Sequence, residues 1–547
     1  MADTNPIHPF IRIINLLKLD KQDISSLYFY AILSGIIQLV LPLGIQSIIN
    51  FVMYNTASTS LVVLICLVII SVFFVGFLQI NQMKLSEKIQ QKIFVRYAFA
   101  YSDTLPKIRP EATEGYYLPE LTNRFFDTIN LQKGLSKLLL DVPTAFIQIL
   151  FGILLLSFYH SIFIAFGALL LLIVYLIFRL SSERGLETSL KESDFKYKVA
   201  AWLQEISRTQ NTFKNFEYTK LNIQKTDEYT QGYLQNRTHH FGILTTQYWS
   251  LVVFKVVLTA AMLIIGCLLL LNNLINIGQF IAAEIVIIAI MASVEKLITS
   301  IDIVYDVLTA VEKLNKVLQT PTESNGSLIL NAKIPLSVEF KKVNFSYTVN
   351  NQLLNGISFR VEPREKILLN KTVSGIGTST ILKLISNNLS EHTGSILIND
   401  IPVDNYEMQS FRKNVNYLSG QNEIFNGTLW ENITIGNPDV KPETTNHLIK
   451  ELGFTGFIEE FEKGFSTLLF TKGAKLPSHL VQEILLLRTF VQPCQLMILD
   501  EPFKNLNKAK RKKVAEYIIG LPITVIVASE QEGIQEYFSK IIDVKSS

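Results

Sequence analysis

Cysteine is scarce in this sequence, which has 547 residues and 3 cysteines. Cys66 and Cys267 fall in apolar stretches and Cys494 precedes one, so neither a disulfide framework nor a cysteine metal cluster is indicated. The net charge is only +3, which argues against a nucleic-acid partner. The polar N-terminal residues, Met1 to Pro9, predict no signal peptide. No internal repeat or low-complexity tract is evident.

Long apolar stretches, by contrast, are abundant. Hydrophobic residues make up 49% of the chain and its mean hydropathy is +0.30. This is too apolar for a purely soluble protein and too charged for a purely membrane one, so we expect one half of each kind. The predicted transmembrane domain covers residues 1–318 and the second domain covers 335–547. Between them, residues 319–334 read as a linker, because the composition changes there to Pro, Ser, Asn and Gly.

Six stretches in the first half exceed the roughly 20 residues that a membrane span needs. They are at about 27–53, 60–83, 138–159, 161–180, 247–271 and 277–297. The short loops between them contain no Lys or Arg, whereas the loops 85–135 and 181–245 contain 7 and 9. By the positive-inside rule, the two long loops and both termini are cytoplasmic. The chain is therefore predicted to be a multi-pass membrane protein, with the lipid bilayer as a partner.

The segments outside the spans also carry predictions. Phe10 to Leu19 reads as an amphipathic helix that lies in the membrane interface. Each long loop has room for two helices of roughly 20 residues with a short crosspiece. We expect the crosspieces at Gly115–Asp127, which is rich in aromatic residues, and near Glu205–Phe216. We interpret them as coupling elements that dock on another domain, rather than as ordinary helical hairpins.

Ionisable residues inside the spans are costly and are therefore functional candidates. Lys255 and Glu295 are placed to pair near the inner boundary as a structural salt bridge. Glu284 has no partner that the sequence reveals, and it either lines a translocation path or reaches to the outer interface.

The second half alternates short strands with helices, as an α/β nucleotide-binding domain does. We expect strands at Val338–Tyr347 and Lys366–Leu369 and a helix that includes Thr380–Ile385. The loop before this helix resembles the phosphate-binding pattern G-x-x-x-x-G-K-[S/T], whose amides cradle phosphates, whose lysine neutralises them and whose hydroxyl holds Mg²⁺. Thr372 stands at the first glycine position and Thr378 at the lysine position. The candidate nucleotide-binding residues of this loop are Ser374, Gly375, Gly377, Thr378, Ser379 and Thr380.

Two adjacent carboxylates follow the apolar segment Leu496–Leu499. Asp500, together with Ser379, is a candidate Mg²⁺ ligand, and Glu501 is the candidate catalytic residue that orients the attacking water. Without the lysine, the alternative is that both carboxylates persist because they fit a tight turn, and we favour this alternative.

With these motifs in place, nearly the whole chain resembles the ATP-binding-cassette (ABC) exporters. The resemblance implies a membrane all-α domain of six helices followed by an α/β P-loop domain, ATP and Mg²⁺ as cofactors, and two chains in the working unit. Tyr347 matches the aromatic residue that stacks on adenine. Phe425–Ile433 matches the segment after the glutamine loop, and Ile277–Ala282 the entry to the sixth helix. Leu476 lies 24 residues before Asp500, as the family's signature motif does.

The signature motif itself departs from the family's Leu-Ser-Gly-Gly-Gln. Its positions are taken by Leu476, Pro477, Ser478, His479 and Leu480. The motif works through a serine hydroxyl and free amides at a helix N-terminus. Proline removes one amide donor, and histidine adds bulk where glycine lets phosphate approach.

Three further positions depart from the family. Glu530 stands at the switch histidine, and Asn507 replaces an aspartate. Gly420 stands at the glutamine-loop position, although Gln421 is adjacent and is a candidate nucleotide-binding residue.

These losses predict weak or absent binding of ATP and Mg²⁺ and almost no autonomous hydrolysis. Removing one charged donor from a phosphate site costs about 1.5–3 kcal/mol, and losing one preorganised transition-state contact costs roughly a hundredfold in rate. Lys371 precedes the loop and Lys383 lies beyond the first helical turn, so we expect neither to replace the missing lysine.

The sequence therefore predicts the pseudo-ATPase subunit of an exporter for peptide, protein or lipid-like cargo. We expect a heterodimer with a second ABC half-transporter rather than a homodimer, and a periplasmic adaptor is a candidate partner. No peptidase domain precedes the spans, so we expect no leader cleavage by this chain. Two alternatives stay open: a non-transporting scaffold or regulator that retains the ABC fold, and an ordinary ATP-driven homodimeric exporter.

Overall fold

The computed structural model describes residues 9–18, 20–53, 59–113, 118–330, 334–348, 351–370, 377–421, 423–470 and 476–543. The chain forms two compact units. Unit 1 comprises Met1–Lys107 and Gly115–Thr320, and unit 2 comprises Ile108–Glu114 and Pro321–Ser547. The boundary at Thr320 and Pro321 falls inside the segment predicted as a linker.

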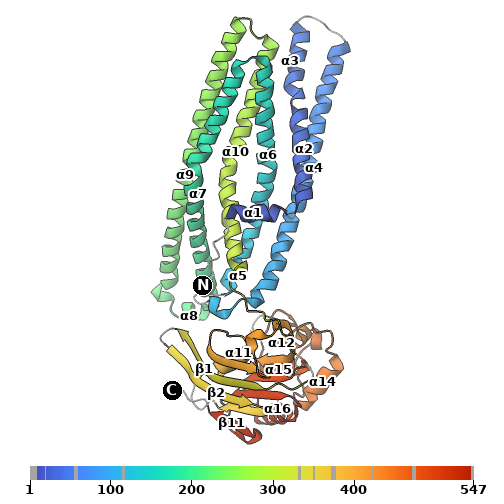
Figure 1. Cartoon of the computed structure of the whole chain (residues 1–547), viewed down its shortest axis with the longest axis vertical. Helices are drawn as coiled ribbons and strands as arrows, with labels where there is room; N and C mark the ends of the chain where they lie inside the picture. The colour runs from blue at the N-terminus through green and yellow to red at the C-terminus, as the bar shows by residue number, and fades with distance from the viewer. Residues whose placement is uncertain are drawn as a thin grey trace. The chain divides into compact units, whose positions relative to one another are not determined.

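Unit 1 is a bundle of long helices (Figure 1). Its α-helices are α1 (Pro9–Lys18), α2 (Lys21–Gln38), α3 (Val40–Met53), α4 (Thr59–Thr104), α5 (Leu118–Thr122), α6 (Asp127–Tyr159), α7 (Ile162–Arg208), α8 (Gln210–Asn215), α9 (Leu221–Leu271) and α10 (Ile277–Leu318). Helix α6 packs along α10, α7 along α9, and α2 along α4. A capping box begins α10, since the Asn276 side chain accepts from the Gln279 amide and the Gln279 side chain accepts from the Asn276 amide.

Five helical segments of the described chain are long and apolar enough to cross a membrane. They are Lys21–Met53, Thr59–Lys107, Glu120–Tyr159, Leu221–Leu271 and Ile277–Leu318. Helix α7 carries a shorter apolar stretch, Ile162–Tyr175. Five of the six predicted spans fall in the five segments, and the predicted span at about 161–180 overlaps the shorter apolar stretch of α7. The first is divided at Leu39, because α2 ends there and Pro42 follows in the first turn of α3.

The side chains of unit 1 are apolar both inside and outside. Phe163, Met262 and Val294 are buried in one core, whereas Phe73 and Phe158 are more than 70% exposed. An outer surface of this kind is unfavourable in water and matches a lipid environment.

The crosspiece of the first long loop is only partly where the sequence predicted it. Residues Ile108–Glu114 belong to unit 2, upstream of the predicted Gly115–Asp127. Within unit 2, the Arg109 amide donates to the Pro321 carbonyl at 3.0 Å, and Glu111 Oε1 accepts from the Ser390 amide at 2.9 Å. These two contacts are polar, and an aromatic-rich pattern does not reveal them.

The second long loop turns where the sequence predicted. Helix α7 ends at Arg208, α8 forms the crosspiece and α9 begins at Leu221. Phe216 and Tyr218, just after α8, are 53% and 79% exposed in this chain.

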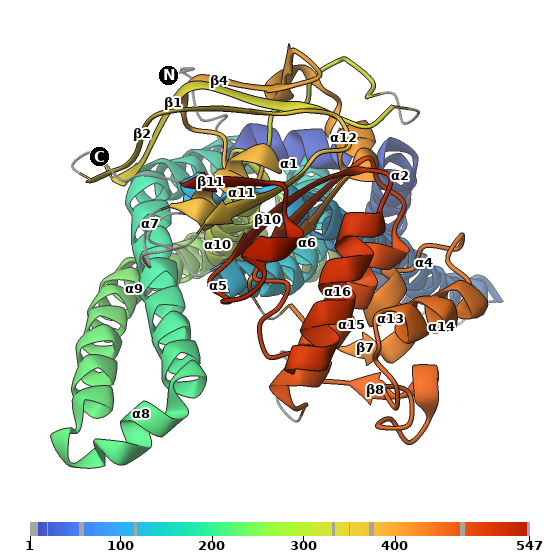
Figure 2. The same cartoon turned by 90° about the horizontal axis from the view of Figure 1, so that it is seen from below.

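Unit 2 combines a parallel sheet, an antiparallel sheet and a set of helices (Figures 1 and 2). The five-stranded parallel sheet has the order β11 (Lys540–Asp543), β3 (Lys366–Asn370), β10 (Thr524–Ser529), β9 (Leu496–Asp500), β6 (Val415–Leu418). The four-stranded antiparallel sheet has the order β2 (Asn351–Val361), β1 (Val338–Thr348), β4 (Thr393–Ile398), β5 (Ile401–Pro402). A small ribbon pairs β7 (Gly427–Thr428) with β8 (Leu468–Leu469).

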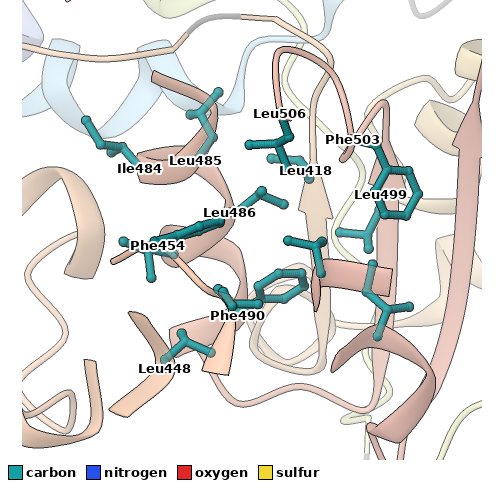
Figure 3. Packing of buried hydrophobic residues seen from close by; sticks show 14 of the residues in the cluster. Leu418, Leu448, Phe454, Ile484, Leu485, Leu486, Phe490, Leu499, Phe503 and Leu506 are labelled. Carbon is teal, nitrogen blue, oxygen red and sulfur yellow. The ribbon is translucent and has the colours of Figure 1, made fainter. Parts of the chain in front are cut away.

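The helices of unit 2 complete a closely packed core. They are α11 (Thr378–Ile385), α12 (Met408–Asn414), α13 (Leu429–Thr434), α14 (Pro442–Glu451), α15 (Ser478–Val491) and α16 (Lys508–Gly520). Figure 3 shows Leu486 and Phe490 of α15 among Phe454, Leu418 of β6 and Leu499 of β9. This packing holds the N-terminal end of α15 and the end of β9 in fixed positions. The α/β fold class, and the strands and helix predicted around the phosphate loop, are confirmed.

Candidate nucleotide-binding site

The phosphate loop connects β3 to α11. Gly377 is the N-cap of α11 with φ +89°, a conformation that glycine adopts at little cost. An added Cβ there would lie 2.8 Å from Leu354 Cδ2, so the glycine also provides space. Ser374 and Gly375 lie outside the described residues.

Ser379 and Asp500 meet at the carboxyl ends of the parallel strands. Ser379 Oγ donates to Asp500 Oδ1 at 3.2 Å. The sheet order is consistent with this contact, because β10 pairs with both β3 and β9 and the carboxyl ends of these strands lie at one edge of the sheet. The two predicted Mg²⁺ ligands are therefore together, and a hydroxyl plus a carboxylate is a donor set that Mg²⁺ accepts.

A cavity of about 400 Å³ opens beside these two residues. Its walls include Glu501, Gln421 and Lys383 as well as Ser379 and Asp500. Lys383, which we expected to be too far along α11, thus contributes a side chain to the cavity.

Thr378 and Thr380, on either side of Ser379, are both buried, at 4% and 5% exposure. Thr378 offers a neutral hydroxyl where the phosphate pattern requires a cation. Thr380 Oγ1 lies 3.1 Å from the Tyr347 hydroxyl, within hydrogen-bond distance. The half-exposed Tyr347 ring therefore lies beside the first turn of α11.

Glu501 is held by the neighbouring strand. Its Oε2 accepts from the Ser529 hydroxyl at 3.2 Å, and its Oε1 accepts from the Glu530 amide at 3.0 Å. Its φ of 53° is left-handed, which is strained for a residue with a side chain. These bonds tie Glu501 to the end of β10 and the residue that follows it.

The signature-equivalent segment begins α15. Pro477 is the N-cap with no side-chain cap bond, and the exposed Ser478 and His479 form the first turn, followed by the buried Leu480. Because first-turn amides have no intrahelical acceptor, those of Ser478, His479 and Leu480 remain available as donors. Proline therefore deletes the donor one position before the helix, not one within it. Leu476 precedes this turn and packs against the core of unit 2.

Three contacts around the site had escaped the sequence-based prediction. Gln482 Nε2 donates to the carbonyls of Glu501 and Pro502, at 3.2 and 3.1 Å, and so joins α15 to the carboxylate turn. Ser529 is a direct partner of Glu501. Asn507 caps α16 by accepting from the Lys510 amide at 2.9 Å. Only the last had a signal in the sequence, since Asn before a helical segment is a preferred N-cap.

Two family descriptions match the chain. Residues 26–294 match the ABC transporter transmembrane region, and residues 354–504 match the ABC transporter domain. Together these cover more than half of the sequence. The chain belongs to the ABC transporter family. Its helical unit carries the family's transmembrane region, and the family binds ATP with Mg²⁺ and works as dimers.

Known proteins support the assignment at the level of fold and family. The structure of a bacterial Atm1-family ABC exporter with ATP bound superposes with a TM-score of 0.86 at 16% identity, covering 96% of this chain and 93% of that one. The lactococcin transport/processing ATP-binding protein LcnC-like of Lactococcus lactis is 24% identical over 53% of this chain and 41% of its own. The α-hemolysin translocation ATP-binding protein HlyB of Escherichia coli O157:H7 is 27% identical over 56% and 44%. The chain spans less than half the length of these two relatives.

The residues present suit the metal better than the nucleotide. Ser379 and Asp500 would hold Mg²⁺. Gln421 lines the cavity, and the Tyr347 hydroxyl lies 3.1 Å from Thr380 Oγ1 of α11. The triphosphate, in contrast, would meet a buried threonine at the lysine position and Glu530 at the switch position. ATP binding is a property of the family, and its strength in this chain is a separate matter.

Proposed function

We propose that this chain is the pseudo-ATPase half of a heterodimeric exporter in a bacterial cytoplasmic membrane. The observation that carries the proposal is the buried, neutral Thr378 at the start of α11. Without the lysine, the site loses a charged donor worth about 1.5–3 kcal/mol of phosphate binding. We therefore expect ATP and Mg²⁺ to bind weakly at this chain's own phosphate loop.

The surroundings of Glu501 support negligible hydrolysis at the same loop. A carboxylate that orients the attacking water needs an oxygen aimed at that water. In this chain, Oε1 and Oε2 already accept from Glu530 and Ser529. The side chain of Glu530 adds a negative charge where the family has histidine, and this charge repels phosphate.

A competent second chain would restore part of the machinery. The ABC resemblance implies that each ATP site joins the phosphate loop of one chain to the signature of the other, so a homodimer of this chain would have two defective sites. A heterodimer would have one site that lacks the lysine and one that uses the partner's lysine with Leu476–Leu480. The free first-turn amides of α15 favour residual turnover at the second site.

The surface of the second long loop is consistent with a partner chain. Phe216 and Tyr218 expose large aromatic side chains next to α8. Exposed aromatic residues at a rigid turn are typical of a surface that another protein covers.

Orientation and cargo follow from the loops and the relatives. The Lys and Arg bias of the two long loops supports a cytoplasmic location for them and for both termini. The names of the two relatives above, lactococcin transport and α-hemolysin translocation, support a peptide or protein as the cargo.

The experiment is co-purification from native membranes, followed by ATPase assays of the isolated chain and of the complex. We expect a second ABC chain with intact motifs in the complex and vanadate-sensitive hydrolysis only there. The double variant Pro477→Ser, His479→Gly should raise the turnover of the complex at least tenfold, because it restores a donor and space at the active site. The matched control is Thr378→Ala, which should leave that turnover unchanged.

The other outcomes are equally specific. Robust hydrolysis by the isolated chain that Thr378→Ala abolishes would establish an ordinary homodimeric exporter. If no second ABC chain co-purifies and the isolated chain is inactive, the scaffold or regulator alternative replaces the proposal.

A further inference from the structure

An apolar groove lies between α1 and α2, in a part of the chain that serves neither the nucleotide site nor the proposed dimer contacts. Its volume is about 580 Å³. Leu17 of α1 and Ile24, Phe29 and Ile32 of α2 line it, and Phe29 is 62% exposed. Figure 1 shows α1 running across the bundle and α2 running along it. The groove therefore follows the corner between an interfacial helix and a membrane span.

Two lysines line the groove where α1 ends and α2 begins. Lys18 is the last residue of α1 and Lys21 is the first of α2. Lys18 Nζ donates to Asn15 Oδ1 at 3.4 Å. No carboxylate of the described residues forms an ion pair with either lysine. The positive end of the α2 helix dipole lies at the same place and favours an anion there.

The two carboxylates closest in sequence to these lysines form ion pairs with cations of α4. Asp20 and Asp23 both bind Lys92 of α4, at 3.1 and 2.6 Å. Asp23 also binds Lys88 at 2.9 Å, and Asp20 binds Arg96 at 3.2 Å. Three cations of α4 thus pair with these two carboxylates, so among the described residues neither carboxylate forms an ion pair with Lys18 or Lys21.

We propose that this groove is a binding site for an anionic phospholipid. The acyl chain would lie along Ile24, Phe29 and Ile32, and the phosphate would bind Lys18 and Lys21. The two features point to one ligand, because an acyl chain explains the apolar wall and a phosphate explains the adjacent pair of lysines. A free phosphate would use only the lysines, whereas a zwitterionic lipid would bring its own cation to them. Each lysine near an anionic headgroup contributes about fivefold in affinity.

The test is native mass spectrometry of the purified full-length chain, exposed to equal amounts of phosphatidylglycerol and phosphatidylcholine. We expect the wild-type chain to retain phosphatidylglycerol preferentially. The double variant Lys18→Gln, Lys21→Gln should lower that preference about 25-fold, which is about fivefold for each lysine. Lys18→Arg, Lys21→Arg should keep it, because the charge is preserved.

The matched control is Lys133→Gln, Lys137→Gln. It removes two exposed lysines, one turn apart on α6, close to the predicted start of the third span. It should leave the lipid preference unchanged. Size-exclusion chromatography checks that each variant remains folded, and the arginine variant keeps the test decisive if the glutamine variant aggregates. The proposal is wrong if the wild type shows no preference, if the control variant falls as far as the groove variant, if the arginine variant also loses the preference, or if millimolar glycerol phosphate displaces the lipid.

Discussion

Gly377 and Thr378 are adjacent positions of the phosphate pattern, and only Gly377 is the residue type that the pattern requires. The backbone requires a glycine at position 377, because φ is +89° and an added Cβ would lie 2.8 Å from Leu354 Cδ2. Thr378, in contrast, stands where phosphate binding requires a lysine. The start of α11 thus has the glycine that the fold needs but not the lysine that phosphate binding needs.

Gly377→Ala should destabilise the chain by about 1–3 kcal/mol, because the new methyl group meets Leu354 and the left-handed backbone disfavours a side chain. Thermal unfolding of the purified full-length chain measures the effect. Gly520→Ala is the control: Gly520 is helical in α16 and has open space around it, so its replacement should be neutral or slightly stabilising. Equal shifts for the two variants would contradict the assignment of strain to Gly377.

Glu483 gives a pH-dependent test at the residue scale. It is fully buried in α15, and burial raises the pKa of its carboxyl although Lys510 opposes the shift. A raised pKa in the folded state means that stability is highest with the group protonated and is lost as the pH rises through that pKa.

Glu483→Gln removes this titration. The difference in melting temperature, variant minus wild type, should therefore increase as the pH rises from about 5 to 8. Glu516→Gln, on the exposed side of α16, is the matched surface control. A Glu483→Gln variant that loses stability steadily relative to the wild type over the same range would reverse the predicted sign.

At the scale of elements, the sequence predicted what depends on local pattern. Apolar length marked the spans, and the strand–loop–helix order marked β3 and α11. It also named Ser379 and Asp500 as candidate Mg²⁺ ligands, and the structure brings the first turn of α11 to the end of β9. It missed Ile108–Glu114 and Ser529, whose roles depend on backbone contacts between residues far apart in sequence. The roles proposed for Tyr347 and for the Leu476–Leu480 segment remain predictions.

Lys255 of α9 and Glu295 of α10 pair at 2.7 Å, as the sequence predicted. Replacing either one with Met leaves a lone charge at membrane depth and should cost about 1–3 kcal/mol. The double Met variant should recover most of this loss. The measurement is a double-mutant cycle of thermal stability in lipid nanodiscs, and additive losses would show that the two side chains do not stabilise one another.

Glu284 lies on α10, the same helix as Glu295, but is not part of this ion pair. One of its carboxylate oxygens, Oε2, is buried and has no hydrogen-bond partner in the described part of the chain. A buried carboxylate oxygen fits a residue that faces the helix bundle better than one that reaches to the interface. This favours a position along a translocation path for Glu284.

At the scale of the whole molecule, the chain combines the transmembrane region and the ABC transporter domain of its family. Its phosphate loop departs from the family's pattern at Thr378. Our proposal is that such a chain assembles with a partner that supplies the hydrolysis.

The central claim is that triphosphate is not held tightly without a cation at position 378. The most direct test is isothermal titration of the purified full-length chain, in lipid nanodiscs, with Mg-ATP. We predict no saturable binding in the micromolar range for the wild type and at least tenfold tighter binding for Thr378→Lys, with Thr378→Ser as the control that changes nothing. Micromolar affinity of the wild-type chain, or no gain from the lysine, would contradict the account.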